Sequence, residues 1–319
     1  MKRALCVNSM EEIGALIRGE AETIDSCLVT RDICEDPNNK FLQIIPYVVF
    51  YTPRHAEGKL LFAHYKRAAK GTEERLQSKS SIGFGGHIDV LEEIKCATSY
   101  VAEDTTTHFT MSKQDLVDTC LAAAKREVTE ELGGDILAAI GTQLDFNEAA
   151  FFMGDQREPV NQVHVGLGLP VRLTNEQFDK FFAEAKITPE EIEALSPMTV
   201  NIRHVVEEMD VSATYAKIAQ QLVQQHGFED WSVRILDYII RKEIFVILRN
   251  IGYDDLYRIA VAKDQAQQAE LTAQQQMQES AETISADATA VAEALVPADA
   301  PAVIEGEVVD ASPVEAVAQ

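Results

Sequence analysis

This sequence of 319 residues has no closely spaced cysteine pairs, no long uncharged apolar run and only a short apolar segment at its N-terminus. Each of these absences excludes a class of protein. Its five cysteines never form a C-x-x-C pair, so neither a disulfide framework nor a zinc knuckle is indicated. The longest apolar stretch, 235–251, contains five charged residues, which excludes a membrane span. The N-terminal apolar run is four residues long, and a signal peptide needs roughly 7–15. We therefore expect a soluble cytoplasmic protein.

Basic residues are also scarce, with 28 Lys and Arg against 52 Asp and Glu. The formal net charge is −24 and the sequence pI is about 4.6. Proteins that follow a nucleic-acid backbone or dock on an anionic membrane use clustered basic charge. Long nucleic acid and membrane partners are therefore disfavoured. A small basic pocket stays open, because net charge does not describe a local site.

The chain changes composition near residue 263. From Asp264 to Gln319 there are 11 acidic residues and no Lys, Arg, Cys or aromatic residue. Such a segment buries too little apolar surface to offset the entropy of ordering it. We predict an acidic, Ala/Gln/Pro-rich disordered tail over 263–319. It either solubilises the protein or docks a protein partner.

The rest of the chain alternates strand-like and helix-like patterns. We expect strands over 41–52, 59–67, 81–90, 141–153 and 162–173. We expect helices after Ser9, over Lys113–Leu132, 175–186, 189–195 and 215–226, and from Trp231 onward. The segment between Val90 and Ser112 lacks periodicity and is interpreted as an inserted loop or hairpin. This order predicts a mixed α/β or α+β fold, with a sheet packed between helices.

Three glutamates of the predicted helix 113–132 carry the clearest chemical signal. Glu127, Glu130 and Glu131 stand at i, i+3 and i+4, so their carboxylates share one side of a helix. Like charges repel at this spacing, and a hard divalent cation such as Mg²⁺ or Mn²⁺ would turn the repulsion into coordination. The alternative is a solvated helix face, because glutamate is a good helix former.

The motif around these glutamates resembles a known family signature. Residues 126–133 read R-E-V-T-E-E-L-G, which is similar to the second half of the Nudix box, R-E-U-x-E-E-x-G-U. The first half, G-x5-E, is matched by Gly86 and Glu92. The family places seven residues between that Glu and the Arg, whereas this chain has 33, and Gly134 replaces the final aliphatic residue. The box thus resembles one interrupted by an insertion.

Further segments resemble a bacterial and phage branch of the same family that is often labelled phosphoesterase. They are QIIPYVVFY, EERL before SIGFGGHI, PVNQVHVGLGLPV and a late EDWS. The resemblance implies a Nudix-type α/β/α sandwich with a mixed sheet over 41–262. An N-terminal extension (1–40) precedes it, an insertion (93–112) lies within the box, and a C-terminal helix and the tail follow.

The resemblance also implies an activity and a site. Family members hydrolyse a phosphoanhydride (pyrophosphate) bond in a nucleoside diphosphate linked to another moiety, and they use Mg²⁺ (or Mn²⁺). On that pattern Glu127, Glu130 and Glu131 would be metal ligands, with Glu130 also counted as catalytic. The backbone carbonyl of Gly85 or Gly86 would complete the shell. Arg126 would orient a box carboxylate without touching substrate.

Weaker candidates complete the expected site. The family's general base varies in position, and Glu207 and Glu208 are candidates, their alternative being a helix surface. Arg75 could hold a phosphate, or pair with a neighbouring glutamate at the surface. His87, directly after the glycines, could contact substrate or be structural.

Two lone side chains are interpreted as structural. His164 is interpreted as packed or hydrogen-bonded on a strand. Trp231, the only tryptophan, is interpreted as the core anchor of the last helix.

Two other functions stay open. A catalytically silent Nudix fold could sense a nucleotide, although retention of all three glutamates favours an enzyme. An interaction protein could depend on its tail, and deleting 264–319 would separate that alternative. The partner expected is a small nucleotide-type molecule. The apolar stretch 235–251 could bury itself within the domain or in a homodimer.

Overall fold

The computed structural model describes residues 2–39, 41–68, 79–96, 98–102, 106–189, 192–202 and 227–252, with scattered positions from there to residue 273. The chain separates into two compact units, Met1–Val261 and Ala262–Gln319. The sheet and helices considered below belong to the first unit. The helix predicted over 215–226, and the tail predicted from 263 apart from those scattered positions, lie outside the described residues. Among the helices that are described, none is long and apolar enough to cross a membrane.

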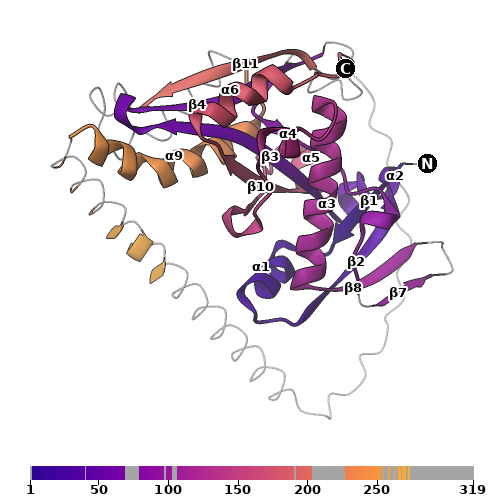
Figure 1. Cartoon of the computed structure of the whole chain (residues 1–319). Coiled ribbons are helices and arrows are strands. Elements are labelled where there is room, and N and C mark those ends of the chain that lie inside the picture. The colour runs from indigo at the N-terminus through magenta and orange to yellow at the C-terminus, as the bar shows by residue number, and fades with distance from the viewer. Residues whose placement is uncertain are drawn as a thin grey trace, which may run out of the picture. The chain divides into compact units, whose positions relative to one another are not determined.

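Eleven described strands join one sheet, and helices flank it (Figure 1). The strands are β1 (Arg3–Val7), β2 (Thr23–Thr30), β3 (Leu42–Arg54), β4 (Lys59–Arg67), β5 (Ser80–Ser81), β6 (Gly83–Phe84), β7 (Thr98–Val101), β8 (Thr107–Ser112), β9 (Ala150–Phe152), β10 (His164–Arg172) and β11 (Ile192–Asn201). The helices are α1 (Met10–Arg18), α2 (Arg31–Cys34), α3 (Lys113–Leu132), α4 (Ile136–Ile140), α5 (Pro159–Gln162), α6 (Asn175–Glu184) and α9 (Asp230–Asn250).

Strand β3 is the centre of the sheet. Along one side it pairs in parallel with β10, from His164 opposite Gln43 to Arg172 opposite Tyr51. Along its other side it pairs antiparallel with β1 near its start, β6 in its middle and β4 at its end. The rest of the sheet extends in the order β11-β4-β3-β1-β2-β8-β7. The mixed sheet expected from the sequence is therefore present.

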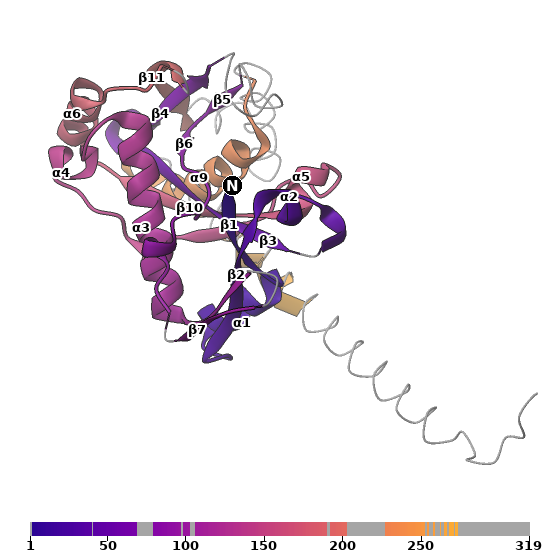
Figure 2. The ribbon, with the colours of Figure 1, turned by 90° about the vertical axis from the view of Figure 1, so that its right-hand side faces the viewer.

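Alternate side chains of β3 enter two different cores, as the period of a strand dictates. Val48 and Phe50 pack in the core on the side of α3, α4 and α6. Tyr47, Val49 and Tyr51 pack on the other side, against α9. Figure 2 shows α3 and α4 on one side of the central strands. Helices thus cover both faces, which confirms the predicted class of a sheet packed between helices.

The long helix α3 has the bounds predicted from its local signals. Ser112 accepts a hydrogen bond from the backbone N–H of Asp115, and the Asp115 side chain accepts one from the Ser112 N–H, which forms a capping box. Gly133 follows the last turn with φ +68°. Strong signals at both ends fix the register of the helix, and therefore which way its glutamates face.

Three sequence predictions are wrong. The strand expected over 81–90 is confined to the short strands β5 and β6 and ends at Phe84. The segment 189–195, expected as a helix, contributes to strand β11, which pairs antiparallel with β4 with an irregularity between Ile192 and Ala194. Pairing at the sheet outweighs the helical propensity of this glutamate-rich stretch. The strand expected over 141–153 is reduced to β9, and Ile136–Ile140 before it is a helix with Asp135 at its N-cap.

The segment interpreted as an inserted loop or hairpin is a hairpin. Strands β7 and β8 pair antiparallel, and β8 also pairs with β2 from the N-terminal segment, Ser112 lying opposite Thr23. Strand β1 in turn pairs with β2 and β3. The hairpin delivers the chain directly from the sheet into the start of α3, because Ser112 both ends β8 and caps the helix.

Candidate functional site

Helix α3, which carries the R-E-V-T-E-E motif, and the glycine pair that follows β6 meet near Arg126. Its guanidinium lies among four carboxylates and one backbone carbonyl, which we call the Arg126 cluster. The contacts are Nη1 to Glu127 Oε1 (2.7 Å) and to Glu130 Oε2 (3.3 Å), Nε to Glu93 Oε1 (2.9 Å), and Nη2 to Asp89 Oδ1 (3.2 Å) and to the His87 carbonyl (2.9 Å). One cation therefore serves four acids, and the cluster carries excess negative charge.

Burial within the Arg126 cluster is graded. The side chains of Glu93 and Glu127 are 14% and 15% exposed, whereas Glu130 is 59% exposed. Burial raises the pKa of Glu127 to about 7, even though Arg126 acts in the opposite direction, and Glu130 and Asp89 add to the rise. Burial likewise raises the pKa of Glu93. Arg126 alone does not compensate the acids around it, which is the electrostatic condition that attracts a further cation.

Gly86 lets the backbone approach this cluster. A Cβ placed there would lie 2.5 Å from Glu127 Oε2, closer than side chains tolerate. At the neighbouring Gly85 a Cβ would lie 1.9 Å from the carbonyl oxygen of Pro46 on β3. The two glycines are thus required for different close approaches. The structure brings the backbone at Gly86 close to the Glu127 carboxylate.

Carboxylate donors fit a hard divalent cation in kind. In the present arrangement Arg126 Nη1 bridges Glu127 and Glu130. Glu131 is buried, 5% exposed, and its charge acts on Tyr65 and Arg67 of β4. Within the part of the chain that is described, no group of three His, Cys, Asp or Glu side chains is arranged to hold a metal ion. The predicted ligands Glu127 and Glu130 share one arginine, and Glu131 lies on the inner side of the helix.

The two histidines considered in the sequence lie together. His87 Nε2 is 3.4 Å from His164 Nε2, and their rings meet edge to face. His164 is 5% exposed and also lies against Trp231, so its interpretation as a packed residue is confirmed. Trp231 donates from Nε1 to Asn161 and contacts the rings of Tyr47 and Phe152, which confirms it as the anchor of α9. His87 reaches the Arg126 cluster through its backbone carbonyl.

Three predicted site residues, Arg75, Glu207 and Glu208, lie outside the described residues. Two members of the Arg126 cluster, Asp89 and Glu93, were not among the predicted residues. The G-x5-E spacing pointed to Glu92, but Glu92 is exposed and the adjacent Glu93 contacts Arg126. The short 3-10 turn Leu91–Glu93 decides which of the two faces the arginine. In the sequence, the adjacent pair Glu92 and Glu93 was the only indication that Glu93 could take the place of Glu92.

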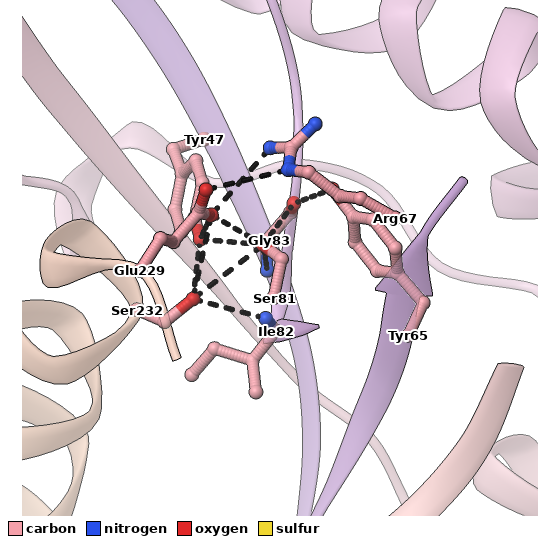
Figure 3. Close-up of polar contacts among 8 residues, drawn as sticks. All are labelled: Tyr47, Tyr65, Arg67, Ser81, Ile82, Gly83, Glu229 and Ser232. Atoms are coloured by element: carbon pink, nitrogen blue, oxygen red, sulfur yellow. Dashed lines mark hydrogen bonds and ion pairs between the residues drawn. The ribbon is translucent and has the colours of Figure 1, made fainter. Parts of the chain in front are cut away.

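A second polar cluster, centred on Glu229, was also missed (Figure 3). Glu229 Oε1 accepts hydrogen bonds from Tyr47 Oη (2.6 Å) and Ser81 Oγ (2.6 Å), and Arg67 Nε lies 3.3 Å from Oε2. Ser232 Oγ accepts from the backbone N–H of Ile82 (3.2 Å) and lies 2.7 Å from the Tyr47 hydroxyl. This Glu229 cluster ties the start of α9 to β3, β4 and β5.

The carboxylate of the Glu229 cluster is fully compensated. Glu229 is 6% exposed, and burial by itself would raise its pKa. Arg67, Ser81 and Tyr47 outweigh that effect, and the pKa of Glu229 is lowered. A buried ion held by one cation and several hydroxyl donors has a structural role as its simplest explanation.

Comparisons with known proteins give partial likenesses. No family model matches the chain. A stretch of 61 residues, 19% of this chain, is 48% identical to Protein YmaB of Bacillus subtilis (strain 168). That stretch spans 26% of YmaB, so the likeness covers about a quarter of the relative. Among solved structures, "Crystal structure of Tm1382, a putative Nudix hydrolase" is similar with a TM-score of 0.35 at 17% identity, over 75% of this chain and 99% of that chain.

Proposed function

We propose that this protein is a Nudix-type hydrolase that uses a divalent cation to cleave a phosphoanhydride bond in a nucleoside diphosphate linked to another moiety. The observation that supports the proposal most is the Arg126 cluster. A Nudix-like R-E-V-T-E-E helix meets the end of a glycine strand there, and four carboxylates gather around one arginine. Excess carboxylate at a partly open position attracts a cation and its phosphate ligand.

In this proposal Glu127, Glu130 and Glu131, with the carbonyl of Gly86, would hold Mg²⁺ or Mn²⁺. When bound, the cation would supply charge neutralisation for the pyrophosphate and lower the pKa of the attacking water. Arg126 is a positioning residue, because its guanidinium fixes Glu127 and Glu130 relative to each other. Arg75 and His87 are assigned to substrate, and Glu207 or Glu208 to proton abstraction from water.

A second candidate, nucleotide sensing without cleavage, is favoured by a specific observation. Arg126 already pairs with Glu127 and Glu130, and Glu131 is buried beside β4. A chain that keeps this arrangement with a nucleotide bound would recognise the ligand but lack a cation site. Turnover separates the two candidates.

The decisive experiment incubates the purified protein and Mg²⁺ with a panel of nucleoside-diphosphate compounds, and follows the products by chromatography. We expect cleavage by the wild type and at least a hundredfold less, about 2.7 kcal/mol in barrier, in Glu130→Gln. The matched control is Glu184→Gln, an exposed helical glutamate on α6. Equal rates in wild type and Glu130→Gln would reject the site. Tight nucleotide binding without turnover would favour the sensor.

A further inference from the structure

A cavity of about 370 Å³ lies at the end of the parallel strand pair β3–β10, and it shares no residue with the Arg126 cluster. Thr52 near the end of β3 and His55 in the turn directly after it line one side. Arg172, Thr174 and Asn175 line the cavity from the end of β10 and the start of α6. The carboxyl ends of parallel strands are a frequent location for ligands in sheets flanked by helices. The volume suits a small molecule or one group of it.

Glu243 of α9, whose side chain is 4% exposed, contacts two polar side chains that line this cavity. Glu243 Oε1 accepts from Tyr51 Oη (2.9 Å) and lies 3.0 Å from Arg172 Nε. Glu243 Oε2 lies 3.1 Å from His55 Nε2 and 3.4 Å from Arg172 Nη2. One buried carboxylate thus orients both an arginine and a histidine that line the cavity.

Arg172 is therefore fixed along one edge and available along the other. Its Nε and Nη2 face Glu243, and its side chain is 52% exposed. Among the described residues, no hydrogen bond or ion pair joins Nη1 to another side chain, while Nη2 also lies 3.3 Å from His55 Nε2. A guanidinium held in place by a buried acid loses little freedom when it donates to an oxyanion, for which its fork is well shaped.

The start of α6 adds donors beside Arg172. The Thr174 hydroxyl and N–H are both used in a capping box with Gln177 (3.1 and 3.0 Å). The N–H groups of the first helical residues, Asn175 and Glu176, have no acceptor within the helix. Such groups carry partial positive charge and favour an anion. Arg172, the cavity and the start of α6 therefore all favour a small anionic ligand.

From this convergence we infer that the cavity binds the oxyanion group, phosphate or carboxylate, of a small molecule. The site is separate from the Arg126 cluster and needs no cation. Thr52, buried and 3.5 Å from Asn175 Oδ1 through its hydroxyl, holds the Asn175 side chain at the rim. Occupation would link β3, β10, α6 and, through Glu243, α9.

The test titrates inorganic phosphate, and separately sodium acetate, into ¹⁵N-labelled protein in EDTA, with sodium chloride at equal ionic strength as reference. We expect saturable shifts of the Asn175 and Glu176 amide resonances with phosphate or acetate but not with chloride. The stronger of the two arms identifies the anion class. EDTA removes the divalent cation, so the result is independent of hydrolysis at the Arg126 cluster.

Two variants complete the test. Arg172→Lys keeps the charge beside Glu243 but loses the fork, and we expect binding at least tenfold weaker. Arg157→Lys, at an arginine whose side chain is 90% exposed, is the control and should bind as the wild type does. An absence of saturable shifts at Asn175 and Glu176, or equal affinity in Arg172→Lys and wild type, would overturn the inference.

Discussion

The Arg126 and Glu229 clusters both pair arginine with carboxylate, but they differ in the number of carboxylates for each arginine. In the Glu229 cluster one carboxylate meets one arginine and three hydroxyl donors, and it is buried. In the Arg126 cluster four carboxylates share one arginine, and Glu130 is 59% exposed. A buried ion must be compensated, whereas excess charge persists only near solvent. Between these two clusters, the excess of carboxylates around Arg126 favours binding of a cation, whereas the compensated carboxylate of Glu229 favours a role in folding.

The pKa directions of the two central glutamates express the same contrast. Glu229 is buried and the Glu127 side chain is 15% exposed, and burial by itself acts to raise the pKa of each. At Glu229 the arginine and hydroxyl donors outweigh burial, so the pKa is lowered. At Glu127 burial prevails and the pKa rises to about 7. A group whose ionised form is disfavoured in the folded protein gains from a further cation.

The largest effect is expected at Glu229. Glu229→Ala leaves Arg67, whose side chain is 23% exposed, as a largely covered charge without its partner. The variant should lower the free energy of unfolding by about 3 kcal/mol. Glu130→Ala, at an exposed position, should change it by less than about 0.5 kcal/mol. Urea unfolding followed by circular dichroism measures both. Similar losses in the two variants would break the distinction between a balanced structural cluster and an open functional one.

A pH dependence of opposite sign follows from the two pKa directions. Because the folded pKa of Glu127 is raised, its contribution to stability is full below its unfolded pKa and is lost as pH rises through about 7. The loss is on the order of 3 kcal/mol. Because the folded pKa of Glu229 is lowered, its contribution is present above its unfolded pKa and disappears as pH falls through the folded value.

Urea unfolding in EDTA from pH 8 down to about pH 2.5 checks this dependence. Glu127→Gln should remove the decline toward pH 7, and Glu229→Gln should remove part of the loss toward acid pH. If the free energy of unfolding of Glu127→Gln still falls toward pH 7 as that of the wild type does, the decline does not come from Glu127. EDTA keeps the measurement on the metal-free protein, in which the pKa of Glu127 is not altered by a bound cation.

Capping signals in the sequence predicted the ends of a helix correctly, because they act locally. The pairing of strands that are distant in sequence could not be predicted from local propensity. Helix α3 has the predicted bounds because the Ser112 capping box and Gly133 act within one turn of each end. Strand β11 was missed because its pairing with β4, more than 120 positions away in sequence, outweighs its own propensity. Propensity carries no information about such a partner.

The candidate site divides in the same way. Arg126, Glu127 and Glu130 are neighbours on one helix, so the motif predicted their meeting. Glu93 joins them from 33 positions away, across the β7–β8 hairpin, and family spacing pointed to its neighbour Glu92. The Glu229 cluster joins residues as far apart as Tyr47 and Ser232, 185 positions. No periodicity or spacing rule in a single sequence connects groups at that separation.

A stability effect smaller than that of Glu229→Ala is expected at Gly86, and comparison with the neighbouring Gly85 tests the site. A Cβ at Gly86 meets the end of the Glu127 side chain, which can move, so Gly86→Ala should cost only about 1 kcal/mol. A Cβ at Gly85 meets the backbone of β3, which cannot move freely, and Gly85→Ala should cost about 3 kcal/mol.

Displacing Glu127 disturbs the proposed cation site directly. Gly86→Ala should therefore lose turnover out of proportion to its stability, as thermal unfolding and hydrolysis of the same preparation would show. If Gly86→Ala keeps full turnover while remaining folded, the contact between Gly86 and Glu127 is packing alone, and the cation must be held elsewhere.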